Sequence, residues 1–429
     1  MMHDSTGGPV SRREFVKATA AAAALTTGLP AYGLGRGAGK LRVGVIGCGG
    51  RGTGAAANIL EASPDTVIIA LADVFPERIA SARGELSKLQ GMSDRFQATD
   101  DTCYTGFDGY KQLLANRDVD VVILATPPGF RPTQFAAAIN AGKHVFFEKP
   151  VAVDGPGIRK VMEAGKLAAD RKLCVVTGTQ RRHEACYLDA MKRIRDGAIG
   201  NVVSAEVYWN QGPLWMNQRQ PAWSDMEWQL RNWLYFTWLS GDHIVEQHVH
   251  NIDVMNWAIG AHPLRATGMG GRQVRTSPDY GHIFDHFAVV YEYPDGVIGT
   301  SMCRQIDGCA NRVEEIIHGC SGRCMLSSGR AAIDGTTSWK FQGDEANPYV
   351  QEHRDLIAAI TGSAPYLNEA QRVAESTLTA IMGRMSAYTG KAVTWDQALN
   401  SKIDLSPAKW ELGPIPTPEV AVPGKTPLA

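Results

Sequence analysis

The chain has 429 residues, of which 44% are hydrophobic and 20% are charged, and its formal net charge is −1. This length and composition are typical of a globular protein with two domains that each bury a full core. The near-neutral charge argues against a general attraction to nucleic acid. After Leu25 no apolar run approaches the roughly 20 residues that a membrane span needs, so we expect none in the mature protein.

The N-terminal segment has the pattern of an export signal. Arg12 and Arg13 lie in the arrangement Ser-Arg-Arg-x-Phe-Val-Lys, and an Ala-rich segment follows to Leu25. This combination is typical of bacterial twin-arginine signals. We therefore expect residues 1–39 to be a signal and linker, the twin-arginine export machinery to be a partner, and the protein to be periplasmic or otherwise exported. The alternative is a disordered basic N-terminus.

Between residues 40 and 155, short apolar runs alternate with helical patterns. The predicted strands are Leu41–Ile46, Val67–Asp73, Val119–Thr126 and His144–Pro150. Such alternation predicts an α/β fold with a parallel, doubly wound sheet. We expect residues 40–155 to form an NAD-binding Rossmann domain.

A glycine fingerprint follows the first predicted strand. Gly47, Gly49 and Gly52 have the spacing that allows a tight turn, close approach of a pyrophosphate, and packing of helix on strand. Asp73 ends the second predicted strand, where an acid accepts hydrogen bonds from the adenosine ribose. An acid there favours NAD over NADP because it repels a 2′-phosphate, although Arg78 lies nearby in the sequence. The alternative is a glycine turn beside a solvated aspartate.

Lys149 lies in the sequence Glu-Lys-Pro that ends the fourth predicted strand, at the edge where such sheets bind ligands. A lysine there can exchange a proton with a substrate hydroxyl during hydride transfer. Taken alone, the residue also fits an exposed structural lysine. The predicted cofactor-binding residues are Gly47, Gly49, Arg51, Gly52, Asp73, Thr126, Pro127, Glu148 and Lys149.

A second polar cluster reads Gly-Asp-His-Ile-Val-Glu-Gln-His-Val-His-Asn-Ile-Asp. If this segment is helical, one face carries His243, Glu246, His250 and Asp253. Glu246 can then orient the imidazole of His250 through a hydrogen bond, whereas His248 points elsewhere. One alternative is a helix whose polar groups satisfy one another in a core. Another is a metal site, because His and Glu at this spacing can chelate; we predict no metal, because the cofactor already offers a redox mechanism.

Residues 156–400 differ in pattern from the first domain and predict an α+β domain with a large, mostly antiparallel open sheet. The predicted strands are Val202–Trp209, two strands within His286–Met302 joined by a Pro-Asp-Gly turn, and Arg312–His318; predicted helices are Asp154–Leu173 and Tyr349–Thr389. We expect this domain to bind substrate. Residues 401–429 are rich in proline and predict an extended tail.

Seven of the ten tryptophans lie between Trp209 and Trp257. Aromatic faces suit the apolar C–H faces of sugars, although most such residues pack in cores or interfaces. We expect one or two of them to line the site. The predicted substrate-binding residues are Arg182, Trp209, His248 and Asp253.

From about Leu41 to Leu399 the chain resembles the Gfo/Idh/MocA family, named for glucose–fructose oxidoreductase, inositol dehydrogenase and a rhizopine catabolic protein. The resemblance rests on the glycine fingerprint, on "ATPP" (Ala125–Pro128), on "AGKHVFFEKP" (Ala141–Pro150) and on an acid-x-x-x-His-x-x-Asp pattern, in the family's order.

The resemblance implies that Lys149 is the catalytic lysine and that His250 relays the substrate proton. Glu246 stands where many members have Asp, and His248 where many have Gly. Where the family often has a histidine after the Thr-Pro turn, this chain has "PGFRPTQF". The resemblance also implies a sugar, polyol or glycoside substrate, and a homodimer or homotetramer formed through the domain of residues 156–400.

We expect an NAD-dependent oxidoreductase that acts on a secondary hydroxyl of such a substrate. Because an exported protein cannot draw on a cofactor pool, the cofactor must be tightly held and recycled. One alternative is an NAD-dependent glycosidase that works by transient C3 oxidation, elimination and water addition. Another is a non-catalytic sugar-binding protein of the same fold.

Overall fold

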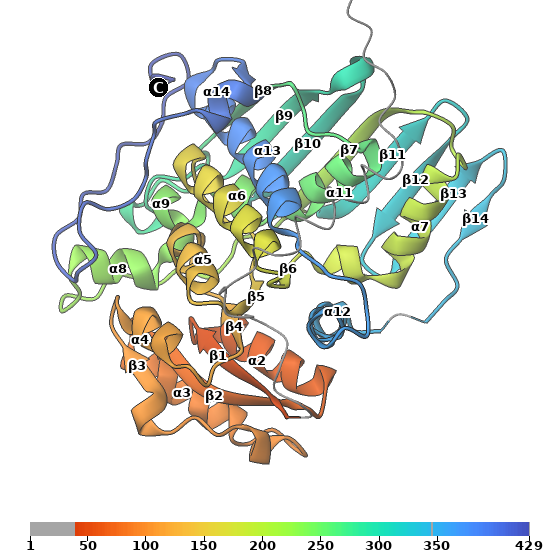
Figure 1. Cartoon of the computed structure of the whole chain (residues 1–429). Coiled ribbons are helices and arrows are strands. Elements are labelled where there is room, and N and C mark those ends of the chain that lie inside the picture. Colours follow the sequence, from red (N-terminus) through yellow and green to blue (C-terminus); the bar gives the residue numbers. More distant parts are fainter. Residues whose placement is uncertain (1–38, 345, 429) are drawn as a thin grey trace, which may run out of the picture. The chain divides into compact units, whose positions relative to one another are not determined.

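The structure is a computed structural model that describes residues 39–344 and 346–428 (Figure 1). The twin-arginine pattern falls outside these residues, so the export signal stays a prediction. Among the described residues, no helix combines the length and the apolar character needed to cross a membrane.

The first sheet is parallel, with six strands in the order β3-β2-β1-β4-β5-β6. The strands are β1 (Leu41–Ile46), β2 (Thr66–Asp73), β3 (Cys103–Thr105), β4 (Val121–Leu124), β5 (His144–Phe147) and β6 (Val175–Thr177). β4 and β5 are buried along their whole length, as expected for strands covered on both faces. The predicted parallel sheet is confirmed, and β6 continues it beyond residue 155, within the segment predicted for the second domain.

Crossover helices connect these strands. They are α2 (Gly50–Ala62), α3 (Pro76–Leu86), α4 (Gly109–Ala115), α5 (Arg131–Asn140) and α6 (Gly155–Asp170), with the 3-10 turns η1 (Ser93–Arg95), η2 (Asp100–Thr102) and η3 (Pro128–Phe130). Asp154 caps α6, because its side chain accepts a hydrogen bond from the backbone N–H of Gly157 at 2.8 Å.

The second sheet has nine strands in the order β14-β13-β12-β11-β7-β10-β9-β8-β15. The strands are β7 (Val202–Gln211), β8 (Arg265–Gly271), β9 (His286–Glu292), β10 (Ile298–Gln305), β11 (Arg312–Gly319), β12 (Gly322–Ser327), β13 (Arg330–Gly335), β14 (Trp339–Lys340) and β15 (Val393–Thr394). All neighbouring pairs are antiparallel except β7 and β10, which are parallel. The predicted fold class, a Rossmann sheet followed by a large and mostly antiparallel sheet, is confirmed.

Helices α7, α11 and α13 pack on one face of the nine-stranded sheet (Figure 1). The remaining elements are η4 (Gln180–His183), α7 (Ala185–Arg195), α8 (Asp225–Arg231), η5 (Trp233–Tyr235), α9 (Thr237–Ser240), α10 (His243–Glu246), α11 (Val249–Ile259), η6 (Pro278–Tyr280), η7 (Pro294–Gly296), α12 (Pro348–Thr361), α13 (Ala370–Thr389) and α14 (Trp395–Leu399). The helical region predicted at Tyr349–Thr389 is two helices, because Gly362 ends α12 in the left-handed conformation (φ 76°).

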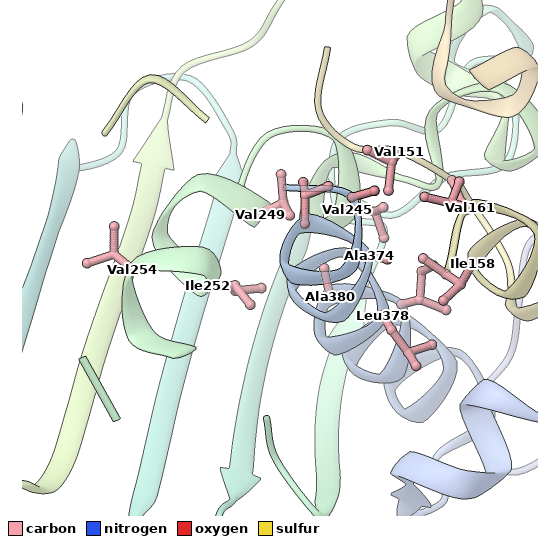
Figure 2. Packing of buried hydrophobic residues seen from close by; sticks show 14 of the residues in the cluster. Val151, Ile158, Val161, Val245, Val249, Ile252, Val254, Ala374, Leu378 and Ala380 are labelled. Carbon is pink, nitrogen blue, oxygen red and sulfur yellow. The ribbon is translucent and has the colours of Figure 1, made fainter. Parts of the chain in front are cut away.

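α13 is the central helix of the core and is buried along most of its length. Figure 2 shows Ala374, Leu378 and Ala380 of this helix with side chains of α6 and α11 around it. Most of its buried residues are small or apolar, and the buried Arg384 is satisfied by the backbone oxygen of Gly241, to which it donates at 3.0 Å. This packing joins α6, which follows the Lys149 strand, to α11, which carries His250.

Candidate functional site

The carboxyl ends of the parallel strands open into a cleft of about 590 Å³. β1 and β4 are neighbours in the sheet, and this is the point where the strand order reverses, at which such sheets bind ligands. One wall carries the glycine loop and the ends of β2, β4 and β5. The opposite wall comes from residues 215–246 of the later chain.

The glycine loop leaves room for a dinucleotide pyrophosphate. Gly47 has φ +93°, and a Cβ there would lie 2.6 Å from the backbone nitrogen of Thr126. A Cβ on Gly52 would lie 1.8 Å from the carbonyl oxygen of Gly47, so helix and strand could not approach as they do. At Gly49, by contrast, a Cβ would meet no atom within 4 Å, which leaves open space beside the start of α2. The loop therefore fits the cofactor that its spacing predicts.

Asp73 lies at the end of β2 and lines the cleft. Its Oδ2 accepts the backbone N–H of Cys48 at 2.7 Å, and its Oδ1 accepts that of Phe75 at 2.9 Å. Burial raises the pKa of the Asp73 carboxyl, and the two backbone hydrogen bonds oppose this rise. Arg78 also lines the cleft, so the structure does not separate NAD from NADP.

Arg51 and Glu148 form an ion pair beside the loop, with 3.0 Å between Nε and Oε1. The Arg51 guanidinium also lies over the ring of Tyr349, 5.0 Å from its centroid. Behind them Glu352 of α12 is fully buried, and burial together with Glu148 raises the pKa of Glu352 well above its ordinary value. All of the predicted cofactor-binding residues except Gly52 line the cleft.

Lys149 meets Glu246 at the floor of the cleft. The lysine Nζ donates to the backbone oxygen of Glu246 at 2.6 Å and to its carboxylate Oε1 at 3.1 Å. Both side chains are largely buried, and both residues line the cleft. This arrangement places a carboxylate within hydrogen-bond reach of the amine, as proton exchange requires.

The predicted single helix over His243–Asp253 is wrong. α10 ends at Glu246 and α11 begins at Val249, and the His248 Nε2 between them bonds to the Ser301 hydroxyl of β10 at 2.8 Å. The predicted hydrogen bond between Glu246 and His250 is also absent among the described residues. Glu246 turns to Lys149 instead, because the break between the helices changes its direction.

The imidazole of His250 stacks on Trp209, with 5.7 Å between the ring centroids. Burial, together with the nearby charges of Lys149 and Arg181, lowers the pKa of His250 well below its ordinary value. The ring is therefore neutral at pH 7, and the same environment makes it a weaker proton acceptor than an ordinary histidine. Burial likewise lowers the pKa of His248, to about 3.

The structure does not bring the four predicted substrate-binding residues into the cleft. Arg182 and Asp253 form a buried ion pair outside the cleft, with 2.7 Å between Nε and Oδ2. Arg372 and Ser376 also donate hydrogen bonds to the Asp253 carboxylate. His248 and Trp209 are not among the cleft-lining residues either, although Trp209 supports His250. Two other tryptophans, at 215 and 233, line the cleft, within the number expected.

Arg131 is a site residue that the sequence analysis missed. It is buried in the cleft wall and donates to the backbone oxygens of Thr126 (2.8 Å), Glu148 (3.0 Å) and Pro150 (2.7 Å). Burial lowers the pKa of Arg131 to about 10, so it stays charged at pH 7. The residue thereby fixes the backbone on both sides of Lys149. Its position in "PGFRPTQF", where the resembling family often has histidine, was the available signal.

Within the described ranges, no group of three or more His, Cys, Asp or Glu side chains is arranged to hold a metal ion. Glu246, His248 and His250 each face a different partner, which are Lys149, Ser301 and Trp209.

Two family profiles match the chain. The profile described as oxidoreductase family, NAD-binding Rossmann fold (GFO_IDH_MocA) matches residues 41–179, and the GFO/IDH/MocA C-terminal domain profile matches residues 187–324.

Among individual proteins, the chain is similar to an inositol 2-dehydrogenase of Acidothermus cellulolyticus. The two are 24% identical over 322 residues, which are 75% of this chain and 81% of the relative. The chain is also 28% identical to a 2,7-anhydro-N-acetylneuraminate hydratase of Escherichia coli over 189 residues, 44% of this chain and 46% of that protein. Its fold is similar to that of an aldose-aldose oxidoreductase from Caulobacter crescentus, with a TM-score of 0.65 and 18% identity over 83% of this chain and 99% of the other.

Proposed function

This chain belongs to the Gfo/Idh/MocA family of oxidoreductases, and from that premise we propose that it oxidises a secondary hydroxyl of a sugar, polyol or glycoside with a tightly held, recycled NAD. The observation that carries the proposal is the hydrogen-bonded pair of Lys149 and Glu246 on the floor of the cleft that also holds the glycine loop and Asp73. A proton-transfer pair and a dinucleotide cradle in one hollow suit the oxidation of an alcohol.

The residues of the chain have distinct roles in this proposal. A bound nicotinamide supplies a hydride acceptor. Lys149 binds the substrate hydroxyl and takes its proton, and Glu246 holds the amine in place through two oxygens. The family resemblance assigns the onward relay of the proton to His250, a neutral imidazole that is stacked on Trp209 and is not among the cleft-lining residues. Arg131 keeps the strand end that carries Lys149 in position.

We propose NAD rather than NADP as the cofactor. Both oxygens of Asp73 are already held by backbone N–H groups, so the carboxylate presents a fixed negative charge where a 2′-phosphate would lie. Arg78 is the residue that works against this preference. Asp73→Ala is expected to relax it.

A second candidate is a redox-neutral reaction, in which the same substrate is oxidised, altered by elimination or water addition, and reduced again. Its support is the similarity to a protein named as a hydratase, whose overall reaction involves no net oxidation. The Lys149–Glu246 pair offers both a proton acceptor and a carboxylate for such steps.

Two measurements test the proposal. Denatured protein should release NAD(H) in near-stoichiometric amount, and intact protein incubated with a panel of sugars, polyols and glycosides should yield a product. A keto-sugar supports the oxidoreductase, and a cleaved or hydrated product without net redox change supports the second candidate. Protein that is folded but neither contains nor binds a nicotinamide dinucleotide contradicts both.

We further propose export by the twin-arginine route, supported by Arg12 and Arg13. Replacing both with lysine should leave folded protein in the cytoplasm, as cell fractionation would show. Unchanged export of that variant contradicts the route and with it the basis for a cofactor that is loaded before export.

We also propose that the face of the nine-stranded sheet opposite its helices mediates a homodimer or homotetramer. Its support is a row of side chains on the outer face of three paired strands: Met269, Ala288 and Met302. Met269 is 75% exposed and Met302 is 40% exposed, and Val290 and Ile298 are exposed on the same face, so the apolar side chains form a patch of the kind that a partner covers.

A further inference from the structure

We propose that α8 and residues 401–417 of the tail form a clasp over the Asp73 end of the cleft, and that this clasp slows release of the bound dinucleotide. The inference rests on the proposed function in one respect, namely that the cleft holds a dinucleotide. Residues 401–428 contain no helix or strand and lie along the surface. The role of this tail is therefore inferred from its contacts with the rest of the chain.

The tail reaches the cleft through Trp410. Its ring packs against those of Phe130 and Phe107, with centroids 4.8 Å and 6.4 Å away, and against that of Trp238 at 5.9 Å. Phe107 and Phe130 themselves line the cleft, one after β3 and the other between β4 and α5. Trp410 therefore supports two aromatic side chains of the cofactor wall from behind. Aromatic contacts of this kind are worth more than the area that they bury.

The tail also holds α8. The carbonyl oxygen of Gly413 accepts the backbone N–H of Met226 at 3.0 Å, near the start of this helix. The Gln229 amide donates to the oxygens of Ile415 and Pro416, both at 3.4 Å, and its own oxygen accepts the indole N–H of Trp238 at 2.7 Å. Three successive contacts thus tie the tail to one short helix.

The last residue of α8 crosses to the Rossmann module. Arg231 pairs with Glu77 of α3, with 2.6 Å between Nη2 and Oε1, and its guanidinium lies 4.0 Å from the ring centroid of Phe75. The N–H of Phe75 holds the Asp73 carboxylate. The contact therefore ends two residues from the predicted ribose site, and Arg231 lines the cleft there.

Together these contacts bridge the two walls of the cleft at one end. A dinucleotide lying from the glycine loop to Asp73 would have α8 on its open side. It could leave only after the Arg231 contacts separate, and the tail resists that separation because it anchors α8. Barriers of this kind act on the dissociation rate, where most differences in affinity between related complexes appear.

The test loads the full-length protein with NADH, mixes it with excess NAD⁺, and follows release by the loss of bound-NADH fluorescence. Trp410→Ala and Arg231→Gln should each speed release by at least about tenfold, and Glu77→Gln by about twofold to fivefold, because the Glu77 carboxylate is half-exposed to water. The Arg231→Gln/Glu77→Gln double variant should be no faster than Arg231→Gln alone, because loss of Arg231 already removes the ion pair with Glu77.

Matched controls keep similar chemistry away from the bridge. Lys409→Ala alters the exposed neighbour of Trp410, and Arg219→Gln removes an ion pair with Asp225 that stays within one wall. Both should release NADH within about twofold of the parent rate, because neither spans the cleft.

The outcomes separate the clasp from the proposed function. Parent protein that holds NADH, with bridge variants releasing it at the parent rate, overturns the clasp alone. Parent protein that binds no dinucleotide overturns the proposed function and the clasp with it. If Trp410→Ala fails to fold by circular dichroism, the Arg231 and Glu77 variants decide, because each removes a surface contact without opening a core.

Discussion

Lys149 and Glu246 are 97 residues apart in the chain, yet one hydrogen-bonded pair joins them in the cleft. The lysine comes from the end of a parallel strand and the glutamate from a four-residue helix of the second domain. Neither domain alone therefore presents the pair. In the proposed reaction, proton transfer therefore depends on the relative placement of two elements that fold around different sheets.

Lys149→Met should reduce turnover on the true substrate by a factor on the order of 10² to 10⁴, because it removes a positioned proton carrier. Dinucleotide content after denaturation should stay at the parent level, since the glycine loop and Asp73 are unchanged. Lys160→Met is the matched control, because this lysine lies exposed on α6. Full turnover by Lys149→Met would remove the lysine from the mechanism.

His250 predicts the shape of the pH profile. An ordinary histidine that accepts a proton loses activity as the pH falls through about 6.5, because it becomes protonated. Burial and the charges of Lys149 and Arg181 lower the pKa of His250, so the neutral ring persists to lower pH. We expect kcat/KM to stay level through pH 6.5 and to fall only at more acidic pH. A fall centred near pH 6.5 that is absent in His250→Gln would contradict this environment.

For single residues, the sequence predicted which side chains line the cleft better than it predicted their hydrogen-bond partners. Gly47, Asp73 and Lys149 are placed by local patterns around strands, and those patterns hold. The partner of Glu246 depends on where the chain turns after α10, and His248 sets that turn through Ser301, 53 residues away. Arg131 was not predicted because its role depends on hydrogen bonds to three backbone oxygens that follow two different strands. Spacing in the sequence does not show that these oxygens lie close together.

At the scale of elements, η4, α12 and the start of α13 meet through a buried charge cluster. His183 of η4 lies 2.5 Å from the carboxylate of Asp355 on α12, and its other nitrogen lies 3.7 Å from Glu369. Burial lowers the pKa of His183, but these carboxylates outweigh burial and raise it to about 9. The protonated histidine thus fastens α12, the helix behind the glycine loop.

His183→Gln should lower the free energy of unfolding by about 2 kcal/mol at pH 6, less than for a fully buried pair because Asp355 is 38% exposed and water screens it. The folded pKa lies above the unfolded value, so this stability is complete below about pH 6.5 and is lost as the pH rises through about 9. Chemical denaturation of parent and variant from pH 6 to pH 10 measures the difference.

Asp355→Asn removes the other side of the same contact. The His183→Gln/Asp355→Asn double variant should lose less unfolding free energy than the two single variants lose in sum, because both changes remove the same contact. A His183 effect that stays constant from pH 6 to pH 10 would contradict the raised pKa.

Elements with strong local signals were predicted well, and those shaped by distant contacts were not. β1 has the predicted bounds, Leu41–Ile46, because an apolar run before a glycine turn has few alternatives. The helical periodicity of His243–Asp253 was real, but tertiary contacts divided the segment into α10 and α11. The tail was predicted as extended from its prolines, whereas its grip on α8 depends on where Trp410 and Gly413 dock.

At the scale of the whole molecule, the open face of the nine-stranded sheet is the proposed interface between copies of the chain. Met302→Asp should convert the assembly to monomers, because it places a charge in the middle of the outward apolar row. Light scattering coupled to size exclusion measures the mass. Leu188→Asp on α7 is the matched control, being an exposed apolar residue on a helix of the covered face. A parent protein that is already monomeric contradicts the proposed interface.

The parallel pairing of β7 with β10 has a consequence for how the molecule assembles. Neighbouring antiparallel strands can begin to pair at a tight turn, but residues 212–297 separate β7 from β10. Closing so long a loop costs chain entropy before the strands make any stabilising contact. The enclosed stretch carries Glu246 and His250. We therefore expect the nucleotide module to acquire its shape early, while the proton-handling residues wait for the centre of the second sheet to close. In a refolding experiment, dinucleotide binding should return ahead of activity, and the interval between them would time that closure.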